Sequence, residues 1–445
     1  MHLIAVGPKV AAKPGRINGK LHVWAAAALR VNAPTSYMDV PLEMRIASSP
    51  LLLPMFFSWP QPLLLSHLST ITSHPAVQCD PPPRPAMAAE LLARYPWVSR
   101  PFIASAPMRV LSGPALAVAV SRAGGLGFIG PAANTQDITV NLEEASRLVK
   151  IARESSSSSV SNVFPPASSC LPVGIGFQLW ADDVNAAVAN IERFRPCAAW
   201  LFAPREGPEE LEAWSRQIRR ACPDTQIWIQ IGTLGEARGL LQLSERPDVV
   251  VVQGAEAGGH GRARDGMGLM TLLPEVADAM ASTRIPLLAA GGIADGRGAA
   301  AALCLGASGA VMGTRFLASS EARISKGYQN EIVRASDGAV ATTRTLLYNH
   351  LRGTFGWPAD YQPRTIINKS FVDHQAGIPF EELKKRHDEA AKTGDSGWGP
   401  EGRLATYAGT SVGLIHGVKA AGDIVREVQL DALEKIRSAN SKGKL

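Results

Sequence analysis

The sequence has few cysteines, and they are scattered. Five occur in 445 residues, with no C-x-x-C pair and no histidine at metal-ligand spacing: Cys79, Cys170, Cys197, Cys222 and Cys304. This pattern excludes a disulfide framework and a zinc site, so we predict no metal centre. Scattered free thiols are typical of a reducing compartment.

Two further features are missing: a long uninterrupted apolar run and a basic stripe. Several prolines interrupt the most apolar stretch, residues 48–70, so we predict no membrane span. The net charge is +6, but most of the excess lies in residues 1–86. The rest of the chain, residues 87–445, shows no basic face interleaved with aromatic residues. We therefore expect no binding to nucleic acid.

The sequence changes character near Met87. Residues 1–86 are rich in Pro, Ser and Leu without a sustained period, which indicates a poorly ordered extension or a targeting segment. Residues 1–38 contain basic residues and no acid, as a mitochondrial transit peptide does. We therefore expect a cytoplasmic protein, or a mitochondrial one if this segment is a transit peptide.

From about residue 99, short apolar runs alternate with Ala-rich segments of helical period. We predict eight strands, at 101–108, 125–130, 172–179, 198–204, 226–233, 248–255, 285–293 and 309–316. The clearest helices between them are 111–123, 181–194, 207–222, 234–244 and 295–307. This alternation predicts an α/β fold, a (β/α)8 TIM barrel, with its site at the carboxyl ends of the strands.

Four segments follow from this pattern. We expect the extension over 1–86, the barrel over 87–320, a helical lid or substrate segment over 321–430 that packs on the barrel, and a polar tail over 431–445. A helix at 379–392 belongs to the lid, and the serine run 155–159 is expected to be a flexible insertion.

A polar cluster follows the buried sixth strand in "VVVVQGAEAGGHGRARDG" (249–266). His260 lies among glycines that let a ligand approach the backbone, and an imidazole suits proton abstraction. A lone histidine can equally be structural. Glu256 could orient His260 or cap the next turn, and Gln253 could bind a heterocycle or tie down the loop.

Glycines end the last two strands. Gly291 and Gly292 precede one helix, and Gly313 and Thr314 stand at the next strand–helix junction. Backbone N–H groups from both loops can converge on one phosphate, as in many barrels, although such glycines can also simply permit tight turns.

Two other motifs are better explained by packing. Gly125, Gly127 and Gly130 satisfy G-x-G-x-x-G but do not open a helix, as a dinucleotide site requires. "GTSVG" (409–413) satisfies the serine-hydrolase pattern, but no acid separates Ser411 from His416, the one histidine that follows it. A packed helix start is the better interpretation.

Five segments together resemble the nitronate monooxygenases, formerly called 2-nitropropane dioxygenases, over about residues 99–420. They are "APM" (106–108), "QGAEAGGHG" (253–261), "AAGGIADG" (289–296), "VMGTRF" (311–316) and "YAGTSVGLI" (407–415). Residues 351–370 are also similar to the family's class I enzymes, which favours an oxygenase. The glycine and histidine elements occur as well in NAD(P)H:quinone reductases and FMN-dependent enoyl-thioester reductases.

The resemblance implies FMN as cofactor, with His260 as the catalytic base that removes a proton from a neutral nitroalkane. In the family, the nitronate gives one electron to the flavin, oxygen reacts, and a carbonyl compound and nitrite form. Propionate 3-nitronate is the substrate it suggests, with O2 as co-substrate. The sequence leaves the oligomeric state open, with a homodimer as one option. The implied cofactor-binding residues are Ala106, Pro107, Met108, Gly176, Gln230, Gln253, Gly258, Gly291, Gly292, Val311, Met312, Gly313 and Thr314.

One position departs from the family. Many members have Asn where this chain has Gly176, which can contact a flavin only through its backbone. Two alternatives to the oxygenase stay open: an FMN-dependent reductase that uses NAD(P)H, and a non-catalytic barrel that binds a phosphorylated ligand.

Overall fold

The computed structural model describes residues 84–155, 164 and 170–442. The expected N-terminal extension, apart from its last three residues, and the serine run after residue 155 lie outside the described residues. Helix α1 (Arg84–Arg94) leads into the barrel.

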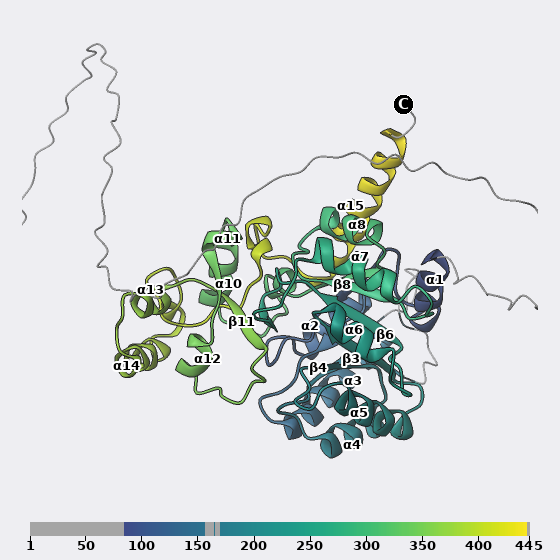
Figure 1. The fold of residues 1–445 in the computed structure, drawn as a ribbon, viewed down its shortest axis with the longest axis horizontal. Coiled ribbons are helices and arrows are strands. Elements are labelled where there is room, and N and C mark those ends of the chain that lie inside the picture. The colour runs from purple at the N-terminus through teal and green to yellow at the C-terminus, as the bar shows by residue number, and fades with distance from the viewer. Residues whose placement is uncertain (1–83, 156–163, 165–169, 443–445) are drawn as a thin grey trace, which may run out of the picture. The chain divides into compact units, whose positions relative to one another are not determined.

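Eight parallel strands form the barrel in the order β1-β9-β8-β6-β5-β4-β3-β2 (Figure 1). A bridge between Ala104 and Leu126 joins the two ends of this order, where Ser105 N donates to Leu126 O at 3.1 Å. The predicted α/β barrel is therefore confirmed. The strands are β1 (Phe102–Ser105), β2 (Phe128–Ile129), β3 (Leu171–Gln178), β4 (Pro196–Phe202), β5 (Gln226–Ile231), β6 (Val249–Gln253), β8 (Leu287–Ala290) and β9 (Gly309–Met312).

Helices connect these strands on the outside of the barrel. Each predicted helix is present, slightly shorter than its sequence pattern, and two more, α3 and α7, complete the set. Asp183 and Asp295 begin α4 and α8 by accepting hydrogen bonds from backbone N–H groups of the first turn. The helices are α2 (Pro114–Arg122), α3 (Ile138–Glu154), α4 (Val184–Phe194), α5 (Pro208–Ala221), α6 (Leu234–Leu240), α7 (Leu269–Ala279) and α8 (Gly296–Cys304).

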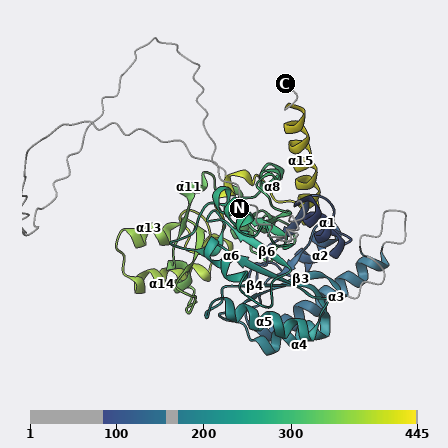
Figure 2. The same ribbon diagram turned by 45° about the vertical axis from the view of Figure 1, so that its right-hand side comes forward.

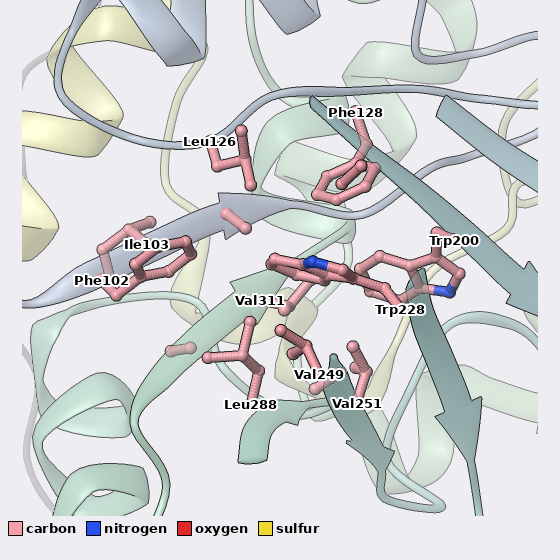
Figure 3. Packing of buried hydrophobic residues seen from close by; sticks show 14 of the residues in the cluster. Phe102, Ile103, Leu126, Phe128, Trp200, Trp228, Val249, Val251, Leu288 and Val311 are labelled. Atoms are coloured by element: carbon pink, nitrogen blue, oxygen red, sulfur yellow. The ribbon is translucent and has the colours of Figure 1, made fainter. Parts of the chain in front are cut away.

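Large aromatic side chains fill the centre of the barrel (Figure 3). The rings of Trp200 and Trp228 are 5.7 Å apart, and Phe128 lies 4.9 Å from Trp228. Trp228 Nε1 donates to the hydroxyl of Tyr95 at 2.8 Å, so its one polar atom is satisfied in the core. Aliphatic residues such as Val251 and Leu288 surround these rings (Figure 3).

The segment after β9 contains the expected helices and also a small sheet that was not predicted. Strand β11 (Tyr361–Ile366) pairs antiparallel with β10 (Thr342–Arg344) and with β7 (Gly259–Arg262), the strand that carries His260. The sheet thus ties this segment to the loop after β6. The remaining elements are α9 (Thr314–Leu317), α10 (Lys326–Arg334), α11 (Gly338–Ala341), α12 (Leu347–Leu351), α13 (Lys369–Gln375), α14 (Phe380–Ala391), and the short 3-10 helices η2 (Gly394–Gly397) and η3 (Thr410–Leu414).

The chain then returns to the barrel in the long helix α15 (Ala421–Lys442), which lies beside α8 and α2 (Figures 1 and 2). Gln429 Nε2 donates to three backbone oxygens, those of Ser99, Pro101 and Gly124. The polar tail expected from residue 431 is therefore, as far as Lys442, the second half of this helix. The buried apolar residues of α15, which are Ala421, Ile424, Val425, Val428 and Ala432, recur three or four residues apart, as in an amphipathic helix.

None of the helices in the described ranges has the length and apolar composition needed to cross a lipid bilayer.

We predict that Trp228→Ala lowers the free energy of unfolding by about 3–5 kcal/mol, because it leaves a cavity in the barrel and removes the donor to Tyr95. Val140→Ala on α3 serves as the control, since Val140 is 65% exposed. Chemical denaturation followed by fluorescence measures both. Equal effects of the two substitutions would contradict the packing described for Trp228.

Candidate active site

A cavity of about 330 Å³ opens at the carboxyl ends of the barrel strands. Of the residues predicted for the site, all except Gly176 and Met312 line it. Loops that are distant in the chain therefore meet around one space. The predicted residues at the cavity are Ala106, Pro107, Met108, Gln230, Gln253, Gly258, His260, Gly291, Gly292, Val311, Gly313 and Thr314.

The two exceptions have packing roles. A Cβ on Gly176 would lie 2.4 Å from Pro107 Cβ, so Pro107 occupies the space that a side chain would need. Met312 is 1% exposed. Successive side chains of a strand point to opposite faces, and its neighbour Val311 lines the cavity, so the Met312 side chain lies on the other face. The Met312 carbonyl accepts a hydrogen bond from Ala106 N at 2.9 Å.

The glycine loops at the cavity have the backbone geometry expected of an anion cradle. Gly291 and Gly292 have φ of +97° and +72°, in the left-handed region that favours glycine. Among the described residues, the N–H groups of Gly292, Gly313 and Thr314 have no backbone carbonyl partner. Free N–H groups from two loops are thus available to a ligand at this end of the cavity.

His260 is held between groups from the segment after the barrel. Its ring stacks on Trp357, with ring centroids 3.5 Å apart and planes 3° from parallel. Its Nε2 lies 2.9 Å from Nδ2 of Asn349, which is 1% exposed. Backbone pairing of His260 with Pro363 completes the arrangement. The imidazole position is therefore set by tertiary contacts on three sides.

The surroundings of His260 disfavour its charged form. Burial, followed by the positive charges of Arg344 and Arg352, lowers its pKa from 6.5 to about 3, while the hydrogen bond with Asn349 acts in the opposite direction. The imidazole is consequently neutral at physiological pH.

Arg344 organises the loop that leads to His260. Its guanidinium donates to the backbone oxygens of Ala255, Ala257, Gly259 and Gln362, at distances of 2.6–3.2 Å. Arg364 adds a second hydrogen bond to Ala255 O at 3.1 Å. These contacts fix the path of the backbone while they leave the guanidinium charge without a carboxylate partner.

The structure shows what Glu256 and Gln253 contact. Glu256 caps α7, because both its carboxylate oxygens accept from Leu269 N, at 2.9 and 3.0 Å. Gln253 ties down the loop by donating to His260 O at 3.3 Å, although its side chain also lines the cavity. Gln230 accepts a hydrogen bond from Trp200 Nε1 at 3.1 Å.

The cavity is positively charged. Arg109 and Arg352 line it, and its lining includes no Asp or Glu. Arg109 donates to the backbone oxygens of Ala132 and Ala133, which hold the side chain without neutralising it. Such a cavity favours an anionic ligand.

Several site residues were not predicted. Asn349, Arg352, Trp357 and Tyr407 all line the cavity and all come from the segment after β9. The similarity of residues 351–370 to class I enzymes was a signal for two of them. Tyr407 opens the segment "YAGTSVGLI", which carries part of the family resemblance, whereas nothing in the local pattern around Asn349 distinguishes it from a packing residue.

Both discounted motifs make packing contacts, and Gly409 and Ser411 of the second motif also line the cavity. "GTSVG" begins η3, where Gly409 N donates to Thr314 Oγ1 at 3.0 Å and Thr410 N donates to Glu256 O at 2.9 Å. A Cβ on Gly127 would lie 1.9 Å from Ala117 O, so this glycine permits close packing of β2 against α2.

The chain is similar to known proteins over most of its length. Residues 215–354 match the family model for nitronate monooxygenase. The nitronate monooxygenase npaC of Metarhizium robertsii is 59% identical over 339 residues, which cover 76% of this chain and 93% of that protein. A nitronate monooxygenase of Neurospora crassa is 34% identical over 371 residues, covering 79% of this chain and 94% of that protein.

A solved structure has the same fold. The nitroalkane oxidase of Streptomyces ansochromogenes aligns with a TM-score of 0.58 and 23% identity, over 78% of this chain and 99% of that one. The extent and identity of the two sequence matches decide the relationship: the chain belongs to the nitronate monooxygenase family of oxidoreductases.

Proposed function

We propose that this enzyme oxidises alkyl nitronates with O2 in an FMN-dependent reaction that yields a carbonyl compound and nitrite. The observation that carries the proposal is the cavity itself: two arginines, a neutral imidazole and two glycine loops surround it, and its lining has no acid. Both FMN and a nitronate are anions, so the charge of the cavity suits both.

The residues present fit FMN. The N–H groups of Gly292, Gly313 and Thr314 lack backbone partners among the described residues and could hold the phosphate. Ala106, Pro107 and Met108 provide an apolar surface for the ring system, and Gln230, Gln253 and Gly258 provide polar groups beside it. When bound, FMN would supply the electron-transfer chemistry with the nitronate and oxygen.

The protein's own groups bind and orient the substrate. Arg109 and Arg352 attract the anion into a cavity whose wall also includes the aromatic side chains of Phe202 and Trp357. An imidazole with a pKa of about 3 is a weak base at neutral pH. The site therefore suits a nitronate that arrives already deprotonated better than a neutral nitroalkane.

The first test is a visible absorption spectrum of the purified protein, followed by oxygen uptake. We expect flavin bands and rapid oxygen consumption with an alkyl nitronate such as propionate 3-nitronate, with nitrite as product. Anaerobic NADH or NADPH should bleach the flavin barely at all. Fast bleaching would support the reductase alternative, and a colourless protein would support the non-catalytic barrel.

A matched pair of glycine variants tests the cofactor site. Gly292→Ala and Gly377→Ala both add a methyl group at positive φ, +72° and +84°, with similar backbone strain. We expect only Gly292→Ala to weaken FMN binding, by about tenfold or 1.4 kcal/mol, since it alone redirects a free cavity N–H. Flavin titration measures this. Equal FMN affinity in the two variants would argue against the cradle.

The pH dependence follows from the neutral imidazole. Because the pKa of His260 is lowered to about 3, its protonation does not change between about pH 5 and 8. We expect kcat/KM for a preformed nitronate to show no inflection near the ordinary histidine pKa. An inflection there that disappears in His260→Asn would contradict this description of the site.

A further inference from the structure

Two side chains, Asn349 and Tyr407, connect His260 to the permanently charged guanidinium of Arg352. Arg352 Nη1 is 2.8 Å from the hydroxyl of Tyr407, that hydroxyl is 3.4 Å from Asn349 Oδ1, and Asn349 Nδ2 is 2.9 Å from His260 Nε2. The middle contact is the longest. The four residues come from β7, α12, the loop that follows α12, and the segment before η3. We call this set the relay.

The hydrogen bonds of the relay run in one direction, from Arg352 through Tyr407 and Asn349 to His260. A guanidinium can only donate, so the Tyr407 oxygen accepts from Arg352 and its own proton points elsewhere. Its acceptor is Asn349 Oδ1, which places the NH2 group of Asn349 against His260. An amide NH2 can only donate, so Nε2 must accept and cannot carry a proton. In a neutral imidazole the proton is then on Nδ1.

The relay is held firmly in place. Tyr328 fixes the backbone of Tyr407 from both sides, since its hydroxyl accepts from Tyr407 N at 2.8 Å and donates to Tyr407 O at 3.1 Å. Asn349 O accepts from the N–H groups of Arg352 and Thr354, which stabilises the turn after α12. Trp357 stacks on the imidazole and restricts its rotation.

One ring nitrogen remains for a ligand. His260 lines the cavity, and its Nδ1 has no hydrogen-bond partner within the described part of the chain. We propose that Asn349 is a positioning residue whose amide, oriented by Tyr407 and Arg352, holds His260 with its proton on Nδ1. The cavity thereby receives an N–H donor for an oxygen of the anionic substrate.

This inference deepens the proposed function and its substrate assignment rests on that function. A nitronate oxygen accepts a hydrogen bond from Nδ1–H, whereas deprotonation of a neutral nitroalkane needs a free lone pair on the nitrogen that faces it. With Nε2 occupied by Asn349 and Nδ1 protonated, the resting imidazole offers no such lone pair. The relay thus selects preformed nitronates, and it replaces the general-base role expected for His260 from the family resemblance.

Nitrogen NMR of protein with 15N-labelled histidine side chains tests the tautomer directly, and it requires neither flavin nor turnover. The His260 signals are assigned by difference from His260→Asn. At about pH 7 we expect Nε2 in the range of an unprotonated imidazole nitrogen and Nδ1 in the protonated range. The opposite assignment in the unmodified enzyme would overturn the proposal, whatever the enzyme's reaction proves to be.

Asn349→Asp reverses the direction of the hydrogen bond to His260 Nε2, because a carboxylate can only accept a hydrogen bond. We expect the proton to move to Nε2, so that Nδ1 gains a lone pair. The groups that face the ring are Arg109, Arg344, Arg352 and Tyr407, and the new carboxylate would offset their positive charge. The ratio of kcat/KM for a neutral nitroalkane to that for its nitronate should rise about tenfold or more. An unchanged tautomer in this variant would contradict the proposal.

Two further variants complete the design. Asn330→Asp makes the same change on the exposed surface of α10 and should leave the tautomer and the substrate ratio as in the unmodified enzyme. Tyr407→Phe removes only the hydroxyl that orients Asn349, and should yield a mixture of both tautomers. If Asn349→Asp does not fold, Tyr407→Phe decides alone: an unmixed Nδ1-protonated spectrum would show that the relay does not set the tautomer.

Discussion

The antiparallel pairing of β7 with β11 is the interaction on which the site depends. Strand β7 carries His260 away from the end of β6, and a segment about a hundred residues later in the chain receives it. Arg344 reinforces the pairing through four backbone oxygens on both sides. The imidazole therefore lies between the barrel and the segment that covers it, and its environment comes from both.

Uncompensated positive charge is the second organising feature. Arg109 and Arg344 bind backbone oxygens and Arg352 binds a tyrosine hydroxyl, so each is held in place without a direct ion pair among the described residues. The nearest acid in the loop, Glu256, is engaged in capping α7. The same arginines that keep His260 neutral thus make the cavity attractive to an anion. The positive charge of the cavity thus matches the negative charge of the proposed nitronate substrate.

The glycines of the barrel mouth serve two physical purposes. At Gly127 and Gly176 another group occupies the position that a Cβ would take, so glycine permits close packing there. Gly291 and Gly292 have positive φ and turn their chain toward the cavity. The sequence context identified Gly127 as a packing residue, because its motif does not open a helix, but it did not do so for Gly176, which lies within β3. Gly176 was assigned to the cofactor site from the family resemblance, through its backbone only, and Pro107 lies where its Cβ would stand.

The sequence by itself determined the barrel and the face that carries the site, because alternating apolar runs and strand-end glycines are local signals; the family resemblance added twelve of the residues that line the cavity. Val249 to Val252 followed by a polar loop illustrates this. Only the tertiary structure decided what surrounds His260. Asn349, Trp357 and Tyr407 reach it through a sheet that joins distant segments, and the positive charge and burial that lower its pKa come from the same long-range contacts. Protonation and tautomer depend on neighbours in space, so no local pattern could reveal them.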